Sequence, residues 1–98
     1  LNNVRELPEF IDQLKNLEEL YIDNLYLKTL PVSLINLPKL KKLSIPTSIE
    51  YLSNELRKLN LDILFLWGSK FGGYNVKQEV YGILIGPNTE RKGSKNLY

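Results

Sequence analysis

Residues 7–22, LPEFIDQLKNLEELYI, and residues 30–45, LPVSLINLPKLKKLSI, contain the same pattern 23 positions apart. Every leucine or isoleucine of the first stretch is matched by an aliphatic residue in the second, and the proline recurs as well. With one further pair ahead of the stretch, the matches are Val4/Leu27, Leu7/Leu30, Pro8/Pro31, Ile11/Leu34, Leu14/Leu37, Leu17/Leu40, Leu20/Leu43 and Ile22/Ile45. A fixed period of this length predicts a repeat architecture, in which one supersecondary unit recurs along the chain.

A third copy of the pattern follows with shorter connections. Residues 49–53 replace the Leu-Pro entry, and Leu56 and Leu59 stand 22 positions after their counterparts in the second copy. The aliphatic residues that follow stand 21 positions after theirs: Leu61, Leu64 and Leu66. Each connection has therefore lost one residue while the order of aliphatic positions is kept. Residues 1–6 fit the end of a preceding unit.

Local periodicity assigns each part of the unit to an element. Residues 20–22, 43–45 and 64–66 alternate apolar with other side chains, which is typical of a strand. Pro8 and Pro31 begin segments with apolar residues every third or fourth position, as in a first helical turn. Because one short strand cannot bury its apolar side alone, stacked copies are expected to form a parallel sheet backed by helical turns.

The pattern L-P-x-x-I-x-x-L-x-x-L-x-x-L-x-L resembles that of the leucine-rich repeat family over about residues 1–67. The resemblance implies an α/β fold: a short leucine-rich-repeat solenoid, a right-handed superhelix with a parallel sheet on its concave face and helical turns on its convex face. It divides the chain into a partial unit 1–6, units 7–29, 30–51 and 52–67, and a non-repeat segment 68–98.

Residues 68–98 lack the repeat spacing and are predicted to form a C-terminal β cap and a basic tail. Adjacent glycines in 68–73 predict a loop. Residues 78–85, QEVYGILI, have the β-branched and aromatic content of a strand, which we expect beside residues 64–66. Residues 86–89 predict a turn, and residues 90–98 are expected to be mobile because they are polar and basic.

Composition excludes several classes of function. The 98 residues make one domain with a net charge of +2, too small to indicate a nucleic-acid or membrane partner. No apolar run is long enough to span a bilayer. The absence of cysteine weakly favours a cytoplasmic, bacterial setting. Because no initiator methionine or signal peptide is present, we expect the chain to be part of something longer.

Catalytic signals are scarce. The chain has no histidine and no cysteine, so it cannot form a Ser-His or Cys-His nucleophile or the usual zinc sites. The glycines at 68–73 are not followed by the Gly-Lys-Ser/Thr of a phosphate-binding loop. Glu18 and Glu19 are expected on an open sheet surface without a cleft. We therefore expect no enzyme activity, no metal, no cofactor and no small-molecule substrate.

Strand alternation predicts which side chains point away from the leucine core. They form three columns across the sheet: Glu19, Lys42 and Ile63; Tyr21, Ser44 and Phe65; Asp23, Pro46 and Trp67. Aromatic residues dominate binding hot spots, and each buries roughly 150–250 Å² on contact. The predicted partner-binding residues are Glu19, Tyr21, Asp23, Lys42, Ser44, Phe65 and Trp67.

Other interpretations of these residues stay open from the sequence. The cap would turn Phe65 and Trp67 into core residues if it folded over them, and the charged positions would then be an ordinary solvated surface. The leading functional hypothesis is a module that binds another protein through the concave face. The alternatives are a structural C-terminal capping fragment of a longer repeat protein and a small regulatory or inhibitory binding protein.

Overall fold

The computed structural model describes residues 3–4, 7, 10–22, 26–46, 48–67 and 78–93. These residues form an α/β domain with short strands and short helices, the latter mostly of the 3-10 type. In chain order the elements are β1 (Asn3–Val4), η1 (Ile11–Gln13), β2 (Glu19–Ile22), η2 (Val32–Asn36), β3 (Lys42–Pro46), η3 (Asn54–Lys58), β4 (Ile63–Trp67), α1 (Gln78–Tyr81), η4 (Gly82–Leu84) and β5 (Glu90–Gly93).

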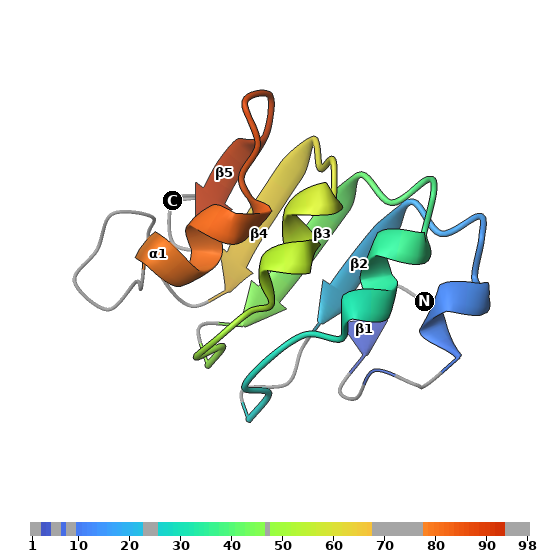
Figure 1. Cartoon of the computed structure of the whole chain (residues 1–98), viewed down its shortest axis with the longest axis horizontal. Coiled ribbons are helices and arrows are strands. Elements are labelled where there is room, and N and C mark those ends of the chain that lie inside the picture. Colours follow the sequence, from blue (N-terminus) through green and yellow to red (C-terminus); the bar gives the residue numbers. More distant parts are fainter. Residues whose placement is uncertain are drawn as a thin grey trace.

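The strands form one parallel sheet in the order β1-β2-β3-β4-β5, the order of the chain itself. Each connection between strands passes through a helix, and Figure 1 shows these helices lying side by side over one face of the sheet. Leu20 pairs with Leu43, and Leu43 pairs with Leu64, so the predicted alignment of these leucines is confirmed. Spacings of 23 and then 21 residues therefore place these leucines opposite one another in the register of neighbouring strands.

Proline or serine begins the helices that follow β2 and β3. Pro31 precedes η2 in an extended conformation, and its carbonyl accepts the amide of Leu34 at 3.3 Å. Ser53 replaces proline before η3, where its hydroxyl accepts the amide of Glu55 at 3.2 Å. Residues three apart eclipse one another in a 3-10 helix, so a short one presents a narrow apolar side. Leu34 and Leu56 are accordingly the buried residues of η2 and η3.

The core lies between the helices and the sheet and consists almost entirely of aliphatic side chains. The buried apolar residues are Ile11, Leu20, Ile22, Leu30, Leu34, Leu37, Leu40, Leu43, Ile45, Ile49, Leu56, Leu59, Leu61, Leu64, Leu66, Tyr81 and Leu84. Nearly every one is a position of the sequence repeat. The repeat therefore predicted the core of the described residues up to Leu66, and missed the contribution of Tyr81 and Leu84.

A ladder of backbone hydrogen bonds joins successive strands at the point where each begins. The Glu18 carbonyl accepts the amides of Lys41 and Lys42 at 2.9 and 3.1 Å. The Lys41 carbonyl accepts those of Asp62 and Ile63 at 2.7 and 3.1 Å. The Asp62 carbonyl in turn accepts the amide of Glu90 at 2.7 Å. The last strand therefore joins the sheet in the same manner as the strands of the repeats.

The predicted strand over residues 78–85 is wrong, because this segment forms α1 and η4 on the helix-covered side of the sheet. Tyr81 and Leu84, three positions apart, are both buried, and Val80 and Ile83 pack partly against the core. This spacing is helical, and burial of these side chains outweighs the β propensity of the segment. The added strand beside β4 is instead β5.

Residues 90–93 were expected to be part of a mobile tail, and this expectation is also wrong. The predicted turn over residues 86–89 is confirmed, with the Thr89 amide bonded to the Gly86 carbonyl at 3.2 Å. The Thr89 hydroxyl donates to the Leu61 carbonyl at 2.7 Å and accepts the Gly86 amide at 3.0 Å. These bonds hold the turn so that the chain enters β5. The predicted glycine loop at 68–73 and residues 94–98 lie outside the described residues.

Tyr81 attaches the C-terminal unit, residues 78–93, to the end of β3 and to the connection between β3 and β4. Its side chain is 1% exposed, and its hydroxyl lies 3.2 Å from the Pro46 carbonyl and 3.5 Å from that of Ile49. Burial raises the pKa of the Tyr81 phenol to about 12, because the charged phenolate would lose its hydration. The phenol therefore remains a neutral hydrogen-bond donor at ordinary pH.

Candidate functional site

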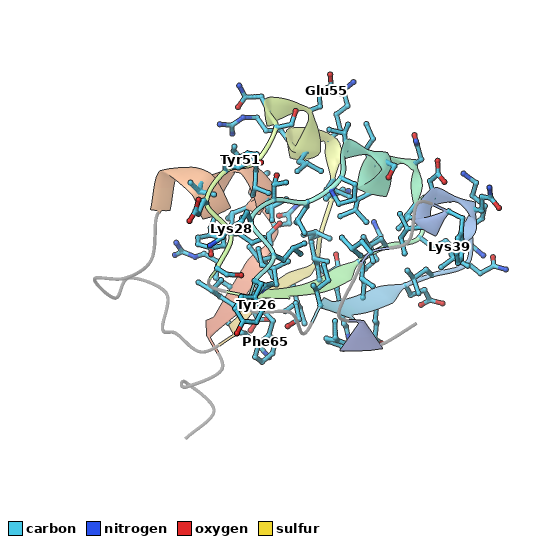
Figure 2. The ribbon with its side chains drawn as sticks, turned by 90° about the horizontal axis from the view of Figure 1, so that it is seen from below. Tyr26, Lys28, Lys39, Tyr51, Glu55 and Phe65 are labelled. Carbon is cyan, nitrogen blue, oxygen red and sulfur yellow. The ribbon has the colours of Figure 1, made fainter. Side chains whose placement is uncertain are left out.

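The face of the sheet opposite the helices, here called the open face, carries the side chains that alternate with the buried leucines. Strand register places them in two rows across β2, β3, β4 and β5: Glu19, Lys42, Ile63 and Glu90; and Tyr21, Ser44, Phe65 and Lys92. Figure 2 shows Phe65 on the opposite side of the molecule from Glu55 of η3. The register of β2 and β3 confirms the predicted side-by-side placement of Glu19 with Lys42 and of Tyr21 with Ser44.

The third predicted column is described only in part. Pro46 pairs with Trp67 in the backbone register and is itself buried. The side chain of Trp67 and the whole of Asp23 lie outside the described residues. Their proposed roles in binding therefore stay predictions from the sequence.

A hollow of about 230 Å³ opens on the open face over β3 and β4. Its walls are formed by Tyr21, Lys42, Leu43, Ile63, Phe65 and Lys92. The register explains its position, because Ser44, with a short side chain, stands between the large rings of Tyr21 and Phe65. The hollow therefore combines an apolar surface from β4 with ammonium groups supplied by β3 and β5.

Ser44 differs from the other predicted contact residues because it is 1% exposed. Among the described residues, its hydroxyl oxygen has no hydrogen-bond partner. A buried hydroxyl without a partner costs about 1–3 kcal/mol of desolvation. Ser44 is therefore not an accessible contact residue, whereas Tyr21, Lys42 and Phe65 line the hollow.

The charged groups of the open face form weak pairs at its edges. Lys42 Nζ lies 4.0 Å from Glu19 Oε2, and Lys92 Nζ lies 3.6 Å from Glu90 Oε2. These side chains are 40–60% exposed, and exposed pairs contribute at most about 1 kcal/mol. Two ammonium groups balance two carboxylates, but of these four residues only Lys42 and Lys92 line the hollow. An incoming anion would therefore meet positive charge that is easily released from its present partners.

Tyr21 is held in place by a carboxylate on its own strand. Its phenol donates to Glu19 Oε1 at 2.5 Å, since the residues lie two positions apart on the same face. This hydrogen bond, together with burial and the negative charge of Glu19, raises the pKa of the Tyr21 phenol. The bond orients the ring of Tyr21 along the wall of the hollow and leaves the other oxygen of Glu19 facing Lys42.

The described part of the C-terminal segment does not cover Phe65. The helices α1 and η4 lie on the opposite side of the sheet, and β5 lies beside β4 in the plane of the sheet (Figure 1). Phe65 remains partly exposed and forms one wall of the hollow. The interpretation of Phe65 as a core residue beneath the cap is therefore wrong for residues 78–93.

Lys92 and Glu90 are the open-face residues that sequence reasoning missed. They were assigned to a mobile tail because residues 90–98 are polar and basic, and the inward positions of their strand hold Arg91 and Gly93 where the repeat has leucine. A search for aliphatic residues cannot find such a strand. Ile63 was placed in a column but was not selected as a contact, although it lines the hollow.

Other site chemistries find no support in the part of the chain that the structure describes. Within residues 3–4, 7, 10–22, 26–46, 48–67 and 78–93, no group of three or more Asp and Glu side chains is arranged to hold a metal ion. The same residues contain no helix with the length and apolar character needed to cross a membrane. The described arrangement offers an apolar surface with cationic groups, which is suited to binding.

Comparison of the chain with family models, with curated proteins and with solved structures finds no match.

Proposed function

We propose that the chain is a leucine-rich-repeat module that binds another protein through the open face of its sheet. In this proposal, units 7–29, 30–51 and 52–67 are turns of a short right-handed solenoid, and the open face is its concave side. Support comes from the paired rows of leucines and from the ladder of hydrogen bonds at Glu18, Lys41 and Asp62. Both features repeat from one unit to the next, as the family architecture requires.

The observation that carries the proposal is the hollow between Tyr21, Lys42, Phe65 and Lys92. Tyrosine is among the residues most enriched at protein-binding hot spots, and phenylalanine is enriched at interfaces. Tyr21 and Phe65 come from strands that are separated in sequence by a whole repeat, and the fold brings them to one surface. Three of the predicted contact residues, Tyr21, Lys42 and Phe65, line this hollow.

The dimensions of the open face suit a small contact. Five strands about 4.8 Å apart span roughly 19 Å, and strands of four or five residues are roughly 13–17 Å long. The resulting area of about 300 Å² is well below the ~800 Å² that each partner contributes to a standard stable interface. The expected occupant of the open face is therefore a loop or a chain segment of the partner, held in a transient complex.

A photo-crosslinker tests the choice of surface. p-Benzoylphenylalanine introduced at Phe65 is expected to trap a partner protein from an extract of the source cells. The matched control places the same group at Glu55, an exposed residue of η3 on the opposite side of the molecule (Figure 2). Equal crosslinking from both positions, or crosslinking from position 55 alone, in proteins with unchanged circular dichroism would contradict the proposal.

A second candidate function, as the terminating unit of a longer repeat array, is favoured by the side chains of β5. At Arg91 and Gly93 the inward rows of leucines end, while Tyr81 and Leu84 complete the core. Such a unit would keep the leucine core covered and the array soluble. Deletion of residues 68–98 is expected to cause unfolding or aggregation if this is its role, whereas a separable tail would leave the fold intact.

A further inference from the structure

The hollow of the open face has a distribution of charge that selects among possible occupants. Two of its lining residues carry an ammonium group, Lys42 on β3 and Lys92 on β5, and β4 runs between them. The β4 side chains in the hollow, Ile63 and Phe65, are apolar. An occupant that matches this surface needs a negative charge held close to an apolar group.

The positions of the two lysines allow both to reach one anion. Their strands are two places apart in the sheet, about 10 Å at ~4.8 Å per strand, and the register places Lys92 two residues, or roughly 7 Å, further along the strand direction than Lys42. Extended lysine side chains are long enough to meet above the intervening strand. Their present partners, Glu19 and Glu90, are 4.0 and 3.6 Å away, distances that indicate weak ion pairs rather than tight hydrogen bonds.

We propose that the hollow receives the C-terminal residue of the partner protein, an apolar residue with a free carboxylate. The carboxylate would lie between Lys42 and Lys92, and the apolar side chain would lie against Phe65 and Ile63. This inference rests on the proposed function, because it names the part of the partner that enters the open face. It also gives β5 a role in recognition, since Lys92 belongs to that strand.

Two features favour a chain terminus over an acidic segment. The hollow, at about 230 Å³, has the volume of seven or eight water molecules at ~30 Å³ each, so it accepts a residue rather than a helix. Glu19 and Glu90 stand at the ends of the same row and would repel further carboxylates along an extended acidic chain. A terminal residue carries its side chain and a single carboxylate on one carbon, which matches this limited space.

Peptide binding measured by fluorescence anisotropy tests the inference. The probe is the N-terminally labelled peptide Gly-Ser-Gly-Ser-Leu with a free carboxylate. Its amide is expected to bind about tenfold more weakly, because charge-assisted bonds to both lysines are lost. A peptide of the same length with an internal glutamate and an amidated end is expected to bind as weakly as the amide. Raising NaCl from 50 to 300 mM should weaken the free acid more than the amide.

Single-residue variants test whether the two lysines cause the preference for the free carboxylate. Lys42→Gln and Lys92→Gln are each expected to weaken the free acid about threefold to tenfold while leaving the amide unchanged. Lys58→Gln, a matched change of charge at an exposed residue of η3, is expected to leave both affinities unchanged. The inference would be overturned if the free acid and the amide bound equally well, or if the internal-glutamate peptide bound as tightly as the free acid. It would also be overturned if the lysine variants left the affinity for the free acid unchanged. If such a result accompanies crosslinking from position 65, the open face still binds a partner but not through a terminus.

Discussion

Two serines of this chain have opposite surroundings. Ser44 is buried on the open face, and among the described residues its hydroxyl lacks a hydrogen-bond partner. Ser53 precedes η3, and its hydroxyl accepts the amide of Glu55. The same side chain is therefore unfavourable in the first position and favourable in the second. In the strand register, Ser44 lies between Tyr21 and Phe65.

Ser44→Ala is expected to stabilise the protein by about 1 kcal/mol, since it removes a buried hydroxyl without removing a hydrogen bond. Ser53→Ala is expected to destabilise it by about 1 kcal/mol, the usual cost of losing a helix cap. Urea unfolding of the two variants measures both changes with the same chemical substitution. A loss of stability in Ser44→Ala as large as that in Ser53→Ala would show that the Ser44 hydroxyl has a partner in solution.

Tyr81 predicts how the free energy of unfolding changes at high pH. Its pKa is raised from 10.0 to about 12 in the folded protein, so the folded state retains its proton longer than the unfolded state. The contribution of this phenol to the free energy of unfolding is therefore fully present below pH 10 and is lost as the pH rises from 10 to 12. At about 1.4 kcal/mol per pH unit, the loss attributable to this phenol is roughly 2–3 kcal/mol.

Tyr81→Phe isolates this contribution. At pH 8 the variant is expected to be about 1 kcal/mol less stable than the wild type, because it lacks the bond to the Pro46 carbonyl. Between pH 10 and 12 the difference should shrink and then reverse. All other side chains are common to both proteins, so subtracting the two unfolding curves isolates the effect of the Tyr81 hydroxyl. A difference that stays constant with pH would mean that the Tyr81 hydroxyl is hydrated.

At the scale of elements, the strands and helices of residues 10–66 could be predicted because apolar residues there decide the register. Leu43 and Ile45 point inward, so Lys42 and Ser44 must point to the open face. The C-terminal unit could not be predicted in this way. Tyr81 and Leu84 show helical spacing within a segment of β-forming residues, and β5 contains no inward aliphatic residue.

Thr89 is expected to be the residue on which β5 depends. Thr89→Val removes the hydroxyl that donates to Leu61 and accepts from Gly86, leaving the Gly86 amide without that acceptor. Amide hydrogen exchange at Glu90, whose N–H is bonded to Asp62, should become at least tenfold faster. The amide of Glu50, bonded to Lys28 in another connection, serves as the internal control and should be unchanged. Unaltered protection of Glu90 would show that the backbone bonds alone hold β5.

At the scale of the whole molecule, stability is shared along a row of similar units, and the central unit contacts neighbours on both sides. Leu43 lies between Leu20 and Leu64 and is 1% exposed. The candidate site also requires several neighbouring units, because its walls come from β2, β3, β4 and β5. The sequence could identify Tyr21, Lys42 and Phe65 on one face, but not Lys92, since that requires knowing that a polar strand follows β4.

Leu43→Ala is expected to cost about 2–5 kcal/mol, the range for truncating a buried leucine. A 98-residue domain has a total stability of roughly 5–15 kcal/mol, so this one change removes a large share of it. Lys42→Ala, at the neighbouring position on the open face, should change stability by no more than about 0.5 kcal/mol. Both are measured by guanidinium unfolding. A cost below 1 kcal/mol at Leu43 would mean that the central row is loosely packed.

The charged sequence of β5 also affects how molecules meet one another. Glu90, Arg91 and Lys92 occupy successive positions on the last strand in the sheet order, followed by Gly93. A sheet that ends in a leucine-bearing strand would be a template on which further chains could polymerise. A chain that paired with the edge of β5 would have to remove water from three successive charged side chains. The charges of β5, the strand that contributes Lys92 to the hollow, therefore disfavour the addition of a further strand at this edge.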